Sequence, residues 1–209
     1  TALQSISLPK SVSYIAGDAF ANCQKLQEIE VSQDNKTFSS DGNDIVKDIT
    51  TNKLLVGSSS SVIADGITEI GDYAFSGRNI ATLSLPNSVR KIGTCAFENT
   101  PLENANINHA TVISDGAFKN CTFLSQVIIS TNSTMTEIGA DAFNSCSSLT
   151  RFTVPQTVKT IGDRAFANCL SLENFGFAQN TVIEQIGELA LMSTAISSFY
   201  LPSTVTSIG

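Results

Sequence analysis

The chain has few residues of the kinds on which catalysis and nucleic-acid binding depend. Its 209 residues include no tryptophan and a single histidine, His109. Only 15% of the residues are charged, and 19 acidic against 12 basic side chains give a net charge of −7. A basic surface that could follow a phosphate backbone is therefore missing, so we expect no nucleic-acid partner.

Long apolar runs are also missing. The longest, such as Val127–Ile129 and Leu54–Val56, are far shorter than the roughly 20 residues that a membrane helix needs, so we expect no membrane span in this chain. Apolar residues nevertheless make up 42% of the sequence, which is enough for a sizeable core. Intrinsic disorder is therefore not expected.

Motifs of enzymes and cofactor sites are scarce. The sequence contains no G-x-S-x-G, Walker A or G-x-G-x-x-G phrase. Any nucleophile system that uses a histidine would need His109, which we interpret as a solvated turn residue within Asn106–Ala110. Two S-x-x-K matches, Ser7–Lys10 and Ser88–Lys91, fall at corners of the repeat described below rather than at the start of a helix. We predict no catalytic residues and a protein that is not an enzyme.

Metal and cofactor sites are equally poorly supported. No C-x-x-C pair accompanies the lone histidine, so zinc has no ligand set. Three carboxylates, Asp41, Asp44 and Asp48, lie close in sequence but lack the spacing of a calcium loop. We interpret them as a solvated acidic turn, with weak calcium binding as the alternative. We therefore predict no metal and no cofactor.

What the sequence does contain is an internal repeat. The phrase I-G-x-x-A-F occurs at Ile70–Phe75, Ile92–Phe97, Ile138–Phe143 and Ile161–Phe166, and weaker copies end at Phe20, Phe118 and Leu191. The intervals between the last residues of these copies are 55, 22, 21, 25, 23 and 25, so one interval contains an insertion and the unit has about 23 residues. Units of this size cannot bury an apolar face alone, and they stack into a solenoid.

A second pattern, L-x-x-L-x-L, follows each copy and alternates apolar with polar residues in the manner of a half-buried strand. A proline often ends it, as in Leu85-Pro86 and Val154-Pro155. We expect the glycine of the I-G step to allow a tight bend and the A-F step to form one helical turn that buries its phenylalanine. The predicted strands are 5–8, 28–31, 60–63, 82–85, 104–107, 126–129, 151–154, 174–177 and 198–201.

The five cysteines follow the repeat. Four of them, Cys23, Cys121, Cys146 and Cys169, lie three residues after the end of a copy, and Cys95 lies inside one. Strand-like stacking would separate equivalent positions by roughly 5 Å, which argues against disulfide geometry. We predict buried thiols that pack as small apolar groups.

The combined phrase, exemplified by Phe143–Gly162, resembles the BspA-type leucine-rich repeat, and the resemblance covers essentially the whole chain. It implies a right-handed leucine-rich repeat solenoid with a parallel β-sheet wall, short helical or 3-10 turns and a second set of short strands. It also implies one solenoid over residues 1–209, which we expect to be a fragment that starts and ends within a repeat. Members of this family are mostly bacterial surface or secreted proteins, so the resemblance implies an extracellular or cell-surface location and a role in adhesion.

The insertion, residues 32–61, resembles the longer unit of that family. We expect an inserted β-hairpin with strands near Ile45–Val46 and Leu54–Val56, protruding from the solenoid edge as a mobile segment.

The remaining candidate for function is the outer face of the strand wall. Its two columns are polar and nearly uncharged, and Tyr and Arg within them are types enriched in binding hot spots. The predicted function is a noncatalytic, monomeric module that binds a protein or other extracellular macromolecule; a structural spacer and a glycan-binding module are the alternatives. The candidate wall residues are Glu28, Glu30, Thr82, Asn104, Asn106, Gln126, Ile128, Arg151, Thr153, Asn174 and Tyr200.

Overall fold

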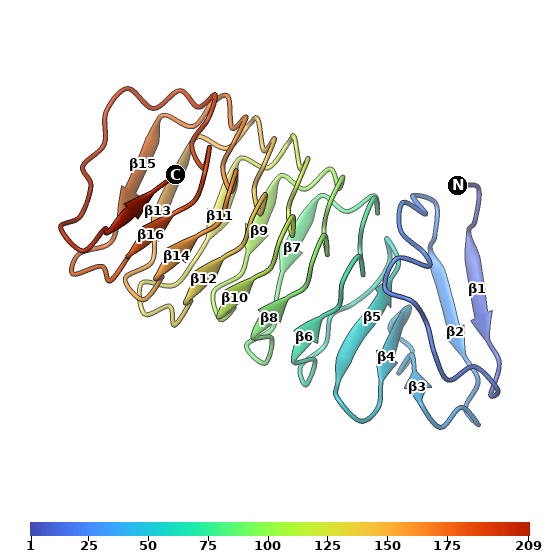
Figure 1. The fold of residues 1–209 in the computed structure, drawn as a ribbon. Coiled ribbons are helices and arrows are strands. Elements are labelled where there is room, and N and C mark those ends of the chain that lie inside the picture. The colour runs from blue at the N-terminus through green and yellow to red at the C-terminus, as the bar shows by residue number, and fades with distance from the viewer.

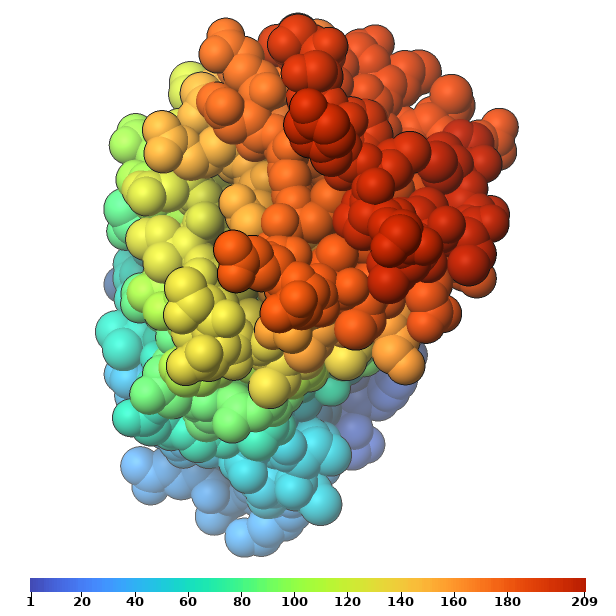
Figure 2. Space-filling view, turned by 90° about the vertical axis from the view of Figure 1, so that its left-hand side faces the viewer, coloured from blue at the N-terminus to red at the C-terminus, as the bar shows by residue number.

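The computed structural model describes all residues from 1 to 209 as a solenoid of stacked coils (Figure 1). Figure 2 looks at the C-terminal end and shows these coils following one another in chain order. Most coils contribute a strand to the wall and a shorter strand to a second sheet. The wall strands are β1 (Ser5–Leu8), β2 (Glu28–Val31), β7 (Thr82–Ser84), β9 (Asn104–Asn106), β11 (Gln126–Ile128), β13 (Arg151–Val154) and β15 (Asn174–Phe177).

The second sheet is the continuous one, with ten strands in the order β17-β16-β14-β12-β10-β8-β6-β5-β4-β3. Its parallel part pairs the isoleucines of the repeat in register, for example Ile70 with Ile92 and Ile138 with Ile161. The second set of short strands that the resemblance implied is therefore present, and the repeat solenoid is confirmed. The parallel short strands are β6 (Glu69–Ile70), β8 (Lys91–Ile92), β10 (Val112–Ile113), β12 (Glu137–Ile138), β14 (Thr160–Ile161), β16 (Gln185–Ile186) and β17 (Ser207–Ile208).

The wall, in contrast, is divided into three sheets, β1-β2, β7-β9-β11 and β13-β15. Two predicted strands are wrong, because residues 60–63 and 198–201 form no strand. The breaks in the wall coincide with the longest coils. Successive strands that pair start 22 or 23 residues apart, whereas β13 starts 25 residues after β11 and does not pair with it.

The A-F segment of each coil is not a helix, which corrects the helical turn expected there. Its N–H groups alternate between two kinds of acceptor. Those of Ala74 and Ser76 donate within the coil, whereas that of Phe75 donates to the next coil, at Ala96 O (2.8 Å). A positive φ of 56° at Tyr73 starts this pattern. A continuous helix would use every one of these donors internally. The segment is not helical because some of its N–H groups donate to carbonyls of the next coil instead.

The glycine of the I-G step has a different role from the bend expected of it. Gly93, Gly139 and Gly162 do not have positive φ angles. A Cβ atom on Gly162 would instead lie 2.4 Å from the amide nitrogen of Ala140 in the preceding coil. Because a side chain would collide with that backbone, the position requires glycine for close approach between layers.

The core is a column of phenylalanine rings along the solenoid axis. Neighbouring rings have centroids 5.2–5.4 Å apart and planes within 4–12° of parallel. Phe20, which ends the first copy of the repeat, is only half-buried, which corrects the expectation that the phenylalanine of every copy is buried. Leu191, which ends the last copy, is also half-buried. The end coils have no full neighbour to cover them. The stacked rings belong to Phe75, Phe97, Phe118, Phe143 and Phe166.

The inserted segment does not protrude. It forms three antiparallel strands, β3 (Phe38–Ser39), β4 (Ile45–Asp48) and β5 (Lys53–Gly57), and β5 continues into the parallel sheet through β6. Its apolar side chains fill the core beside β2, and Val46 and Leu54 are fully buried. The predicted strands near Ile45–Val46 and Leu54–Val56 do pair as an antiparallel hairpin, β4 with β5. The hairpin does not protrude from the solenoid edge, because its apolar residues extend the second sheet instead.

Candidate functional site

The wall columns form as the sequence predicted wherever the strands pair. Gln126 lies beside Asn104, which lies beside Thr82, and Arg151 lies beside Asn174. Parallel, in-register pairing places these side chains on one face at the spacing of adjacent strands, about 4.8 Å. The second column is equally regular: Ser7–Glu30, Ser84–Asn106–Ile128 and Thr153–Gly176 are the register partners.

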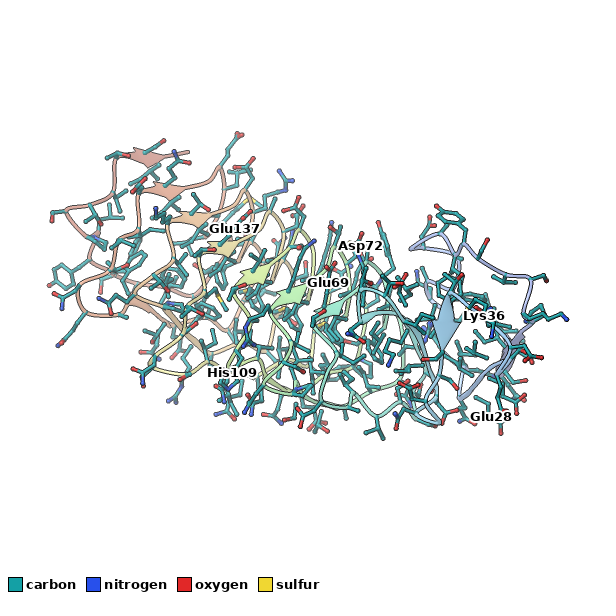
Figure 3. The ribbon with its side chains drawn as sticks, turned by 90° about the horizontal axis from the view of Figure 1, so that it is seen from below. Glu28, Lys36, Glu69, Asp72, His109 and Glu137 are labelled. Carbon is teal, nitrogen blue, oxygen red and sulfur yellow. The ribbon has the colours of Figure 1, made fainter.

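Most candidate wall residues are exposed, and only Asn104 and Asn106 are half-buried. Tyr200 is 94% exposed, but it lies in the segment that forms no strand, so it is not held by the ladder. The charges on the wall are separated along the solenoid. Glu28 and Glu30 lie on β2 at the N-terminal end, and Arg151 lies on β13 near the other end. Figure 3 shows Glu28 on the opposite side from Glu69 and Glu137 of the short strands.

The C-terminal part of the wall is hollowed. A depression of about 490 Å³ lies over β13 and β15 and is lined by Arg151, Thr153 and Asn174 together with Glu173, Gly176 and Ser198. Gly176 on β15 is the register partner of Thr153 on β13, so it occupies an outward position of the wall. No heavy atom lies within 4 Å of the place where a Cβ would be, so the missing side chain opens the depression.

Sequence reasoning missed Glu173 as a member of this depression. The signal was present, because Gly176 is the one glycine among the predicted outward positions of the wall. A carboxylate and a guanidinium on the rim give the depression both signs of charge. It offers a ligand charged donors, charged acceptors and neutral polar groups at once.

The other titratable groups considered in the sequence analysis, His109, Asp41, Asp44 and Asp48, do not converge. His109 is exposed in the turn after β9 (Figure 3). Asp41 pairs with Lys47, whose hydrogen bond lowers the pKa of that carboxyl. Asp44 accepts the N–H of Ile29 at 3.2 Å, and Asp48 caps its own turn. These three carboxylates therefore serve three different partners and do not share a site.

All five cysteines are free thiols, and four of them are buried. It was not predicted from the sequence that these thiols also form hydrogen bonds with backbone carbonyls. The Sγ of Cys121 donates to Phe97 O (3.1 Å), and that of Cys146 donates to Phe118 O (3.2 Å). Burial raises the pKa of Cys121 to about 11 and that of Cys169 to about 12. Weak S–H donors thus satisfy carbonyls of the preceding coil.

This burial predicts a reactivity pattern. In the native protein at pH 8 we expect a thiol reagent to modify Cys95 alone, since it is only half-buried. Its reaction is slow because burial and nearby Glu98 raise its pKa to about 11, which leaves little thiolate. Mass spectrometry should find one label on the native protein and five labels on the denatured protein. Native labelling that persists in Cys95→Ser would show that the stacked thiols are accessible.

Comparison with known proteins supports the fold. The family model of the BspA type leucine rich repeat region matches residues 1–50, 57–137 and 136–209 in six copies. A leucine-rich repeat protein from Eubacterium ventriosum is 22% identical, with a TM-score of 0.86 over 99% of this chain and 57% of that chain. One from Bacteroides ovatus is 25% identical, with a TM-score of 0.70 over 99% and 53%.

A leucine rich cell surface protein from Faecalibacterium prausnitzii is 25% identical, with a TM-score of 0.64 over 99% of this chain and 48% of that chain. The chain thus spans about half the length of the solved structures it matches. No curated protein matched it. The structure contains no helix with the length and apolar character to cross a bilayer. The match of the family model over nearly the whole chain establishes that this protein belongs to the BspA-type leucine-rich repeat family.

Proposed function

We propose that the chain is a noncatalytic binding module of an extracellular or cell-surface bacterial protein and that it binds a macromolecular partner through the strand wall. The observation that supports this proposal is the depression over β13 and β15, which gathers Arg151, Thr153 and Asn174 on a rigid ladder. Side chains already held in place lose little conformational entropy on binding. The leucine rich cell surface protein of F. prausnitzii is consistent with the proposed location.

The binding centre should be Arg151. Its side chain makes no ion pair or hydrogen bond within the chain, and it is exposed at the start of β13. A guanidinium offers planar, paired donors to a carboxylate or amide of a protein partner. Tyr200 contributes a large exposed ring at the end of the same face. Because no ladder holds Tyr200, its contribution should be smaller than that of Arg151.

We expect Arg151→Ala to weaken partner binding by about tenfold, the effect of losing one charged hydrogen bond. The partner is first captured from a mucosal extract on the immobilised chain and identified, and its affinity is then measured by surface plasmon resonance. Arg90→Ala is the matched control, since Arg90 is also exposed but precedes β8 of the second sheet.

Two results would contradict this assignment. Unchanged affinity in Arg151→Ala combined with loss in Asp41→Ala would move the site to the inserted segment. A chain that captures nothing reproducibly would favour the structural spacer, which has no partner of its own.

A further inference from the structure

A second hollow lies away from the wall, at the seam where the inserted segment enters the solenoid. It has a volume of about 430 Å³, within the range of small-ligand pockets. Its lining comes from the turns that lead from the phenylalanine column to the wall. The N–H of Asn22 donates to Ser76 O at 2.9 Å, so the first coil lies directly against the coil of Phe75 on this ridge, even though the insertion separates them in sequence. The lining residues are Gln24, Lys25, Gly77, Arg78, Asn79, Asn99, Thr100, Pro101, Asn120, Thr122 and Phe123.

The charge of this lining is unusual for the chain. It contains two cations, Lys25 and Arg78, and no carboxylate, although acidic residues outnumber basic ones by 19 to 12 overall. Lys25 is exposed and makes no ion pair. The groove is therefore a local positive region on an acidic protein, which favours a ligand with negative charge.

The environment of Arg78 also favours a negatively charged ligand. It occupies the repeat position that Cys121, Cys146 and Cys169 fill in other coils, and it is completely buried. Its Nε donates to Gly57 O at 2.7 Å and its Nη1 donates to backbone carbonyls, but its Nη2 has no partner. Nε and Nη1 connect the first coil, the inserted segment and the coil of Phe75, so these two nitrogens have a structural role. This role does not explain a buried charge that no carboxylate compensates, which is costly in a protein interior.

The neutral part of the lining suits a sugar. The side-chain amides of Gln24 and Asn79 make no hydrogen bond within the chain and offer both donors and acceptors, as hydroxyl groups require. The Nδ2 of Asn120 donates to Asn99 Oδ1 at 3.0 Å, which fixes these two amides in the groove and leaves the Oδ1 of Asn120 as an acceptor. Phe123 is 61% exposed at the far side and presents an apolar ring face. Four adjacent coils contribute to the groove, and at about 4.8 Å per coil they span about 14 Å. This is the reach of an extended ligand of several rings rather than of a single small ion.

We infer that this groove binds an acidic oligosaccharide, with a sugar carboxylate near Lys25 and Arg78 and a ring face on Phe123. Lys25 donates to the carboxylate directly. The Arg78 guanidinium lies in the groove wall and contributes its charge through a medium of low dielectric constant. The amides between them bond the hydroxyl groups of the intervening rings. This site is separate from the wall, so it does not depend on the proposed wall function.

The test uses an oligosaccharide of four rings that alternate glucuronate with N-acetylglucosamine, titrated by calorimetry at low salt. The neutral probe is the tetramer of N-acetylglucosamine. We expect the acidic probe to bind and the neutral probe to bind at least about tenfold more weakly, the worth of one charge-assisted hydrogen bond. A tetraglutamate peptide separates sugar recognition from general attraction of carboxylates.

Lys25→Ala and Phe123→Ala should each weaken binding of the acidic probe by between about threefold and about tenfold. Their matched controls are Lys36→Ala, an exposed lysine outside the groove (Figure 3), and Leu170→Ala, which is 63% exposed on a later coil. Neither control should change the affinity. Thermal melting of each variant confirms that its fold is intact, since all four side chains are at the surface.

Four results would overturn the inference. Equal affinity for the neutral tetramer would remove the role of the carboxylate. Tighter binding of tetraglutamate than of the sugar would assign the groove to an acidic peptide. Absence of binding at millimolar concentration, or binding that Lys25→Ala leaves unchanged, would show that the groove is not the site.

Discussion

Replacing Phe143 by alanine should lower the free energy of unfolding by about 4 kcal/mol. Phe143 is completely buried at the centre of the ring column, stacked on Phe118 at 5.3 Å and on Phe166 at 5.2 Å. It also contacts the ring of Phe152 from the wall. Truncation therefore leaves a cavity that faces three aromatic rings, and the surrounding coils, fixed by hydrogen bonds on both sides, cannot close it.

The measurement is chemical denaturation, supported by a fall in Tm of about 10 °C for a chain of this size. Phe123→Ala is the matched control, because the same atoms are removed from a ring that is 61% exposed. We expect its stability to change by less than about 0.5 kcal/mol. A loss in Phe143→Ala no larger than in the control would show that the repeat has been aligned incorrectly.

Most features that depend on periodicity could be predicted from the sequence. The positions of seven wall strands and of the buried phenylalanines follow from apolar residues that recur at fixed places in each unit, whereas the second set of strands was implied by the family resemblance. The register of Thr82, Asn104 and Gln126 also follows, since equivalent positions in successive coils lie side by side. Because the units stack, residues at the same position of successive units contact one another, so the repeat itself predicts these contacts.

The features that were missed depend on contacts between coils. The pattern of residues 198–201 matches the wall strands, but a strand also requires a hydrogen-bonded neighbour, and neither this segment nor residues 60–63 pairs with one. The A-F segment has the local spacing of a helical turn, but its N–H groups find acceptors in the next coil. In both cases the deciding partner lies more than 20 residues away along the chain, where local propensity has no influence.

The candidate sites divide in the same way. The wall columns could be predicted because they are part of the repeat. The groove at the seam could not, because its lining joins Lys25 to Arg78 across the insertion, and only the structure shows that these coils are adjacent. Arg78 did leave a signal in the sequence, since it replaces a small residue at a position where the other coils carry cysteine or threonine.

Replacing Gly162 by alanine should lower the free energy of unfolding by about 3 kcal/mol, although only one methyl group is added. The new Cβ would lie 2.4 Å from the amide nitrogen of Ala140 and 2.6 Å from the carbonyl carbon of Gly139. These are backbone atoms of the preceding coil, so no side chain can rotate away. The layers must separate at this point, which weakens the bond from Gly162 N–H to Ile138 O, now 2.8 Å long.

Gly176→Ala is the matched control, and it makes the comparison sharp. Gly176 is also a non-terminal glycine without a positive φ, but nothing lies within 4 Å of its added Cβ. Because glycine in a strand loses more conformational entropy on folding than alanine, this variant should be as stable as the parent or more stable by about 0.5 kcal/mol. Denaturant midpoints of the two variants measure the difference directly. Equal midpoints would mean that adjacent coils can separate freely, and that the glycine of the repeat is not required by their close approach.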